Sequence, residues 1–127
     1  MNIPIGLAAA LSALTLAAHV FGGGPEIHAP VQASELSEYL KAILAVIWHT
    51  VTIILTVNSL FLAFAALRDK HRVALVSLVS TQYVLWGILF VYYGLTRLGE
   101  LSTMPQWIAF FLIPALALFG LVGERNK

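Results

Sequence analysis

Hydrophobic residues gather in four long stretches along the chain, and short polar segments separate them. The stretches run over residues 3–21, 39–67, 73–96 and 104–122. A helix needs about 20 apolar residues to cross a hydrocarbon core of roughly 30 Å, so each stretch is long enough to span a bilayer. Short connections make neighbouring helices antiparallel. The pattern predicts an all-α membrane protein, a single domain built as an antiparallel four-transmembrane-helix bundle.

Proline and glycine predict where the first helix begins and ends. Pro4 suits a first helical turn, where its missing N–H would have no intrahelical partner. Three glycines and Pro25 follow the first apolar stretch, and we expect them to end that helix near Phe21. Residues 22–38 would then form a loop that can fold back over the mouth of the bundle.

The composition agrees with a membrane location. Hydrophobic residues make up 60% of the 127 positions and charged residues only 10%, against about 25% charged in an ordinary soluble domain. The chain has no cysteine, which excludes disulfides and thiolate metal sites. A net charge of +1 argues against nucleic acid as a partner, because there is no basic patch to neutralise phosphates.

The distribution of charge predicts the orientation. Five of the seven basic residues lie in the second connection or in the tail: Arg68, Lys70, Arg72, Arg125 and Lys127. The other two, Lys41 and Arg97, lie on the opposite side among four glutamates. The positive-inside rule therefore places both termini in the cytoplasm, an N-in/C-in topology. Because no Lys or Arg precedes the first apolar stretch, we expect it to remain as a helix and not to be cleaved as a signal peptide.

In length and hydropathy the chain resembles short four-helix membrane proteins of bacteria. The resemblance implies a multi-pass protein of the bacterial inner (plasma) membrane, and it carries over no functional residue. Four helices of this length expose much lipid-facing surface. We therefore expect the lipid bilayer as a partner, together with a homo-oligomer or a larger membrane complex.

Histidines are the candidate functional residues. An ionisable side chain within a membrane helix is costly and usually faces the bundle interior, which makes His49 the first candidate. His19 lies near the end of the neighbouring helix, and the outward loop carries Glu26 and His28. We predict that these four converge on a transition-metal site, and their nitrogen and oxygen donors suit zinc, copper or iron. Metal binding, sensing or transport would follow.

Two other interpretations remain open. The histidines could have structural roles in an accessory or assembly subunit of a larger membrane complex, because Thr52, Thr56 and Ser59 follow His49 in one helical stripe that should face protein or water. His19 and His49 could instead be the axial ligands of a b-type haem. His71 belongs to the basic connection and to neither site. No phosphate-binding loop or nucleophile motif indicates an enzyme.

Overall fold

The computed structural model describes residues 1–125, and every regular element over that range is helical. The first three elements are α1 (Ile3–Ala17), a π-helical segment that we call η1 (Ala18–His28), and α2 (Ala29–Gln32). The later elements are α3 (Glu38–Leu67), α4 (Arg72–Tyr93), a second π-helical segment η2 (Gly94–Leu98), and α5 (Gln106–Arg125).

The first helix is longer than the sequence predicts. It continues through the three glycines and Pro25 as η1 and then as α2, so the prediction that it ends near Phe21 is wrong. Each glycine disfavours a helix by only about 1 kcal/mol relative to alanine. Gly23 packs directly on the Trp48 ring of α3, and tertiary packing of this kind overrides a weak local preference. Residues 22–32 are therefore helix and not a loop.

Four continuous helices over residues 1–125 are long and apolar enough to cross a membrane: Ile3–Gln32, Glu38–Leu67, Arg72–Leu98 and Gln106–Gly123. This confirms the predicted all-helical architecture with four helices of membrane-spanning length. The third helix extends two residues past the predicted end because η2 continues it, and the fourth begins two residues later than predicted.

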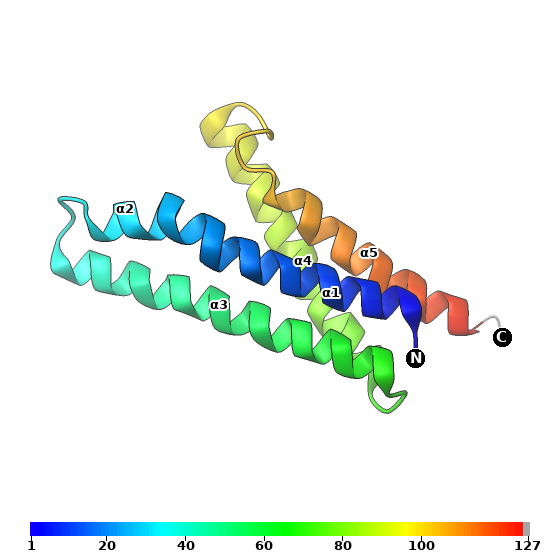
Figure 1. The fold of residues 1–127 in the computed structure, drawn as a ribbon. Helices are drawn as coiled ribbons and strands as arrows, with labels where there is room; N and C mark the ends of the chain where they lie inside the picture. The colour runs from blue at the N-terminus through cyan, green and yellow to red at the C-terminus, as the bar shows by residue number, and fades with distance from the viewer. Residues whose placement is uncertain (126–127) are drawn as a thin grey trace.

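The helices form two antiparallel hairpins that pack against each other at one end. Helix α1 contacts both α3 and α5, while α4 contacts α5 and α3. Figure 1 shows the N-terminus, the α3–α4 turn and the C-terminal end of α5 at the same end of the molecule, and the two hairpins diverging at the other end. The core lies toward the termini, because the buried residues of α3 begin only at Leu55 and η1 has none. Residues 18–54 comprise η1, α2 and the first part of α3, and they project beyond the core. We call them the α1–α3 arm because they continue the hairpin of α1 and α3.

Asn2 ties three helix ends together near the N-terminus. Its backbone N–H donates to the Ala66 carbonyl at 2.8 Å, and its side-chain amide donates to the Gly120 carbonyl, also at 2.8 Å. The Oδ1 atom of Asn2 accepts from the backbone N–H of Ile5 at 3.1 Å and so caps α1. Because Asn2 is only 7% exposed, these bonds also satisfy polar groups that water does not reach.

Arg72, which the sequence places in the basic connection, is a buried residue at the first position of α4. Its Nε donates to the Ala65 carbonyl at 2.6 Å, and its guanidinium forms an ion pair with Asp69 at 2.7 Å. A free carbonyl at the end of α3 is thereby satisfied by a cation, which also complements the helix dipole. The turn between α3 and α4 is thus fixed by a charged hydrogen-bond network.

The turn between η2 and α5 is organised by Glu100. Its carboxylate accepts hydrogen bonds from the hydroxyls of Thr103 and Ser102, the latter at 2.7 Å. These bonds favour the charged form and lower the pKa of Glu100 below its ordinary value. Trp107 closes the turn by donating from its indole N–H to the Leu101 carbonyl at 3.2 Å.

Candidate functional site

Three histidines meet around one tryptophan on the α1–α3 arm. His19 and His28 come from η1, and His49 comes from α3 directly after Trp48. The ring of His19 stacks on Trp48 with centroids 4.0 Å apart, and the ring of His28 stacks on the same indole with centroids 5.3 Å apart. Trp48 thus contacts both histidines of η1, and the predicted convergence of the three histidines with Glu26 on a metal site stays a prediction.

The π-helical hydrogen bonding of η1 brings its two histidines to Trp48 together. In an α-helix, with 3.6 residues per turn, residues nine apart point in opposite directions. The i→i+5 bonds of a π-helix make each turn wider, as in the bond from the Ala29 N–H to the Gly24 carbonyl. His19, Gly23 and His28 are spaced by four and five residues, and all three contact Trp48.

His19 is hydrogen-bonded to α3. Its Nε2 lies 3.3 Å from the Trp48 carbonyl and 3.1 Å from the Thr52 hydroxyl oxygen. The Thr52 hydroxyl donates to that same carbonyl at 3.2 Å, so Thr52 is left as an acceptor toward His19. This pattern assigns a proton to Nε2 of His19 and makes that nitrogen a donor to the α3 backbone.

His28 and His49 face each other and, unlike His19, are not hydrogen-bonded within residues 1–125. Their ring centroids are 5.4 Å apart with the planes at 69°, an edge-to-face arrangement. Neither ring makes a hydrogen bond or ion pair with any other residue between 1 and 125. His49 is exposed and His28 is partly exposed. Each of these two imidazoles therefore has a nitrogen lone pair that can bind a metal ion from solution.

Glu26 differs from the three histidines. It is exposed on η1, and its carboxylate makes no hydrogen bond or ion pair within the described chain. Over residues 1–125, no group of three or more His, Cys, Asp or Glu side chains is placed to hold a metal ion together. The four-residue metal site and the haem site both stay predictions, and the structure singles out His28 and His49 as the free pair.

Trp48 and Gly23 are parts of the site that the sequence reasoning missed. A Cβ atom added at Gly23 would lie 2.8 Å from Cη2 of Trp48, whereas a Cβ at Gly22 would meet nothing within 4 Å. Of the three consecutive glycines, only Gly23 lies too close to Trp48 to carry a side chain. The position of Trp48 directly before His49 could have indicated that Trp48 belongs to the site. Its contact with Gly23 depends on the π-helical period of η1, which the sequence pattern does not predict.

A chain of hydroxyl groups crosses the middle of the bundle. The Tyr83 hydroxyl lies 2.5 Å from the Ser12 hydroxyl, which lies 2.7 Å from the Ser59 hydroxyl, and all three residues are buried. The residues of the predicted polar stripe on α3 have different environments. Ser59 belongs to this hydroxyl chain and Thr52 is hydrogen-bonded to His19, whereas Thr56 is exposed. Two other buried polar atoms, Asn58 Nδ2 and Ser80 Oγ, have no partner within residues 1–125.

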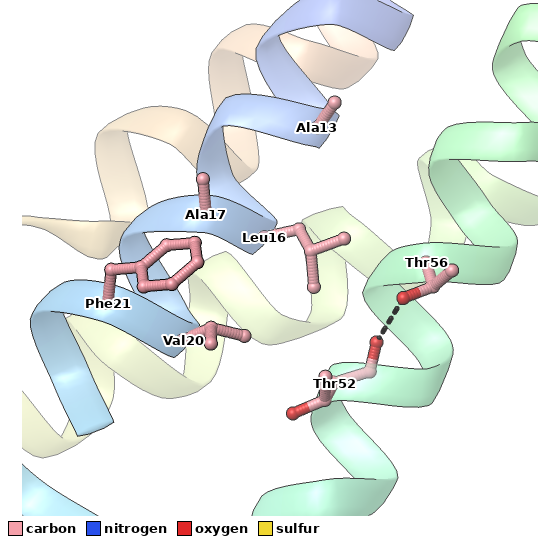
Figure 2. A pocket seen from close by; sticks show the side chains of 7 residues that line it. All are labelled: Ala13, Leu16, Ala17, Val20, Phe21, Thr52 and Thr56. Atoms are coloured by element: carbon pink, nitrogen blue, oxygen red, sulfur yellow. Dashed lines mark hydrogen bonds between the residues drawn. The ribbon is translucent and has the colours of Figure 1, made fainter.

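An open groove of about 300 Å³ runs between α1 and α3 beside the histidines. Figure 2 shows Leu16 and Val20 reaching from one wall toward Thr52 and Thr56 on the other. Small side chains widen it, and its full lining is Ala13, Leu16, Ala17, Val20, Phe21, Thr52 and Thr56. The Thr56 hydroxyl donates to the Thr52 carbonyl at 2.8 Å, so both hydroxyl protons are already used.

Comparison with known protein families, with curated proteins and with solved structures finds no match for this chain.

Proposed function

We propose that the protein is a multi-pass integral membrane protein that binds a transition-metal ion through His28 and His49 at the outer end of the α1–α3 arm. The observation that carries the proposal is the facing pair of imidazoles, whose ring centroids are 5.4 Å apart and which make no hydrogen bond within residues 1–125. Imidazole nitrogen suits zinc, copper and iron, and the absence of cysteine disfavours copper(I).

The depth of the pair supports an outward-facing site. His49 lies eighteen positions before Leu67 at the end of α3, which is about 27 Å of helical rise. A hydrocarbon core is roughly 30 Å thick, so a helix with Leu67 at the inner boundary brings His49 close to the outer one. The basic α3–α4 turn is then cytoplasmic with both termini, as in an inner membrane of bacteria.

Two ligands leave coordination positions open. A tetrahedral zinc site takes four ligands, so water would complete it. Glu26 lies two residues before His28 and is exposed, so its carboxylate adds negative charge near the cation without sharing the face of His28. Open positions also let a metal exchange with solution. Such exchange suits a binding, sensing or transport role better than a permanent structural role.

The test is metal binding by the purified protein and its histidine variants. We expect near-stoichiometric zinc by elemental mass spectrometry, and loss of that zinc in His28→Ala and in His49→Ala. His71→Ala is the matched control, because His71 lies in the turn at the opposite end of the fold. Glu26→Gln should weaken binding by a modest factor, since the variant loses a negative charge near the cation. Equal binding by His49→Ala and His71→Ala would refute the assignment.

A second candidate function is that of an assembly subunit, and the α1–α3 groove favours it. Membrane helices associate through small residues and hydroxyls that let backbones approach, and Ala13, Ala17, Thr52 and Thr56 provide that surface. Filling the groove with Ala13→Trp should then reduce the mass of the native complex extracted from membranes. The control is Ala74→Trp at an exposed position of α4. An unchanged mass in the Ala13 variant would contradict this function.

A further inference from the structure

We infer that Trp48 is the positioning residue of the site, and that its contacts with η1 hold this segment in the π-helical register that places His28 beside His49. The inference rests on the proposed function for its role in metal binding. The positioning itself concerns the structure of the metal-free protein and is tested separately.

Three residues of η1 contact Trp48. His19 and His28 stack nearly parallel to the Trp48 indole, at interplanar angles of 21° and 17°. Between them along the chain, Gly23 lies so close that a Cβ would be 2.8 Å from Cη2 of the same ring. Three successive turns of η1 therefore meet one side chain.

The π-helical register of η1 is costly for a segment of this length. Long π-helices are rare because their geometry is less favourable than that of an α-helix, yet η1 runs for 11 residues and includes Pro25. No residue of η1 is buried, and the tertiary contacts of η1 include α3. Stacking of aromatic rings contributes about 0.5–1.5 kcal/mol beyond burial. Trp48 supplies two such stacks and the contact with Gly23, so it supports η1 at three positions.

Loss of the π-helical register would move His28 away from His49. If η1 relaxed to an α-helix, residues nine apart would lie on opposite faces at 3.6 residues per turn. With His19 still bonded to Thr52, His28 would then point away from α3 and from His49. The site would keep one free imidazole instead of two. Trp48 thus affects metal binding by positioning His28 and is not itself a metal ligand.

The glycines supply matched variants. Gly22→Ala and Gly23→Ala change helix propensity equally, but only the Gly23 variant forces Trp48 to move, because the space at Gly22 is open. In the metal-free protein, Trp48 is made the single tryptophan by Trp86→Phe and Trp107→Phe, and its fluorescence reports the stack. We expect the emission to change in Gly23→Ala and in His28→Ala, and to stay unchanged in Gly22→Ala.

Zinc titration gives the second readout. Loss of a group that orients a metal ligand weakens binding by about 10–100-fold, and we expect this range for Trp48→Leu and Gly23→Ala. Trp48→Phe keeps an aromatic ring and should restore most of the affinity, while Gly22→Ala should bind as the parent does. In the Trp48→Leu background, His28→Ala should have no further effect, whereas His49→Ala should still abolish the remaining binding.

The outcomes separate the two proposals. Emission that responds equally to Gly22→Ala and Gly23→Ala would overturn the positioning role of Trp48, whatever the zinc result. Emission that distinguishes them, with no zinc bound by any variant, would support the positioning role and overturn the proposed function. Suppose that His28→Ala weakened zinc binding by the same factor in the Trp48→Leu background as in the parent protein. Trp48 would then act independently of His28, through folding in general, and the inference would be wrong.

Discussion

The hydroxyl chain through the bundle has a direction that the geometry determines. Ser59 donates to the Leu55 carbonyl at 2.8 Å, which uses its only proton. Ser12 must then donate to Ser59, and Tyr83 must donate to Ser12. The chain runs from α4 through α1 to α3, and it ends on a backbone acceptor. Ser12 and Ser59 each both donate and accept, so the order in which members are removed matters.

Tyr83→Phe removes the first donor and leaves every other proton bonded. The cost is one hydrogen bond, about 0.5–1.5 kcal/mol in proteins generally and about 0.6 kcal/mol on average between membrane helices. We therefore expect a loss of about 0.5–1.5 kcal/mol in the free energy of unfolding.

Ser12→Ala breaks both links and leaves the Tyr83 hydroxyl without an acceptor. Tyr83 is completely buried, so that hydroxyl cannot turn to water, and an unsatisfied buried donor adds about 1–3 kcal/mol. Ser12→Ala should cost about 2–6 kcal/mol, more than Tyr83→Phe, because it loses two hydrogen bonds and leaves one buried donor unsatisfied. The double variant removes the orphaned hydroxyl, so it should be no less stable than Ser12→Ala alone.

The assay is equilibrium unfolding in mixed detergent micelles with increasing sodium dodecyl sulfate, followed by circular dichroism. A double-mutant cycle over Ser12 and Tyr83 gives the coupling energy directly. We expect strong coupling, with the double variant at or above the stability of Ser12→Ala. If the two single losses simply added, the two hydroxyls would not be bonded to each other and the directed chain would be refuted.

Two further predictions concern the ends of the bundle. Gly120→Ala would put a Cβ 2.6 Å from Oδ1 of Asn2. Overpacking of this kind typically costs about 1–3 kcal/mol, so we expect that loss in the free energy of unfolding in the same assay. The control is Gly123→Ala, whose Cβ would meet nothing within 4 Å and which should unfold as the parent does. Thr103→Val removes a hydrogen bond that lowers the pKa of Glu100, so that pKa should rise toward its ordinary value in a carbon-13 NMR titration. Since the bond favours the charged carboxylate, its support of the turn is present above the ordinary pKa and is lost as pH falls; an unchanged titration would contradict this.

Hydropathy was sufficient to predict the helices because each span is long and nearly free of charge. The end of the first helix could not be predicted in that way. The three glycines and Pro25 carry a local stop signal, and the contact of Gly23 with Trp48 overrides it. That contact joins residues 25 positions apart, so no local pattern contains it.

The histidines illustrate the same limit at the site. His49 could be selected from the sequence because an ionisable side chain in an apolar helix is unusual, and His19 and His28 could be placed at the same end of the bundle. Their separate roles depend on which atoms they meet. Nε2 of His19 is bonded to α3 while His28 faces His49, and the difference arises from a π-helical period that hydropathy does not encode.

The central claim is that His28 and His49 together ligate a transition metal. The most direct measurement is X-ray absorption spectroscopy of the zinc-loaded protein, which counts the imidazoles bound to the metal. We predict two imidazoles in the parent protein, and loss of imidazole scattering or of zinc itself in His28→Ala and in His49→Ala. No bound zinc in the parent, or a spectrum that neither variant changes, would contradict the claim.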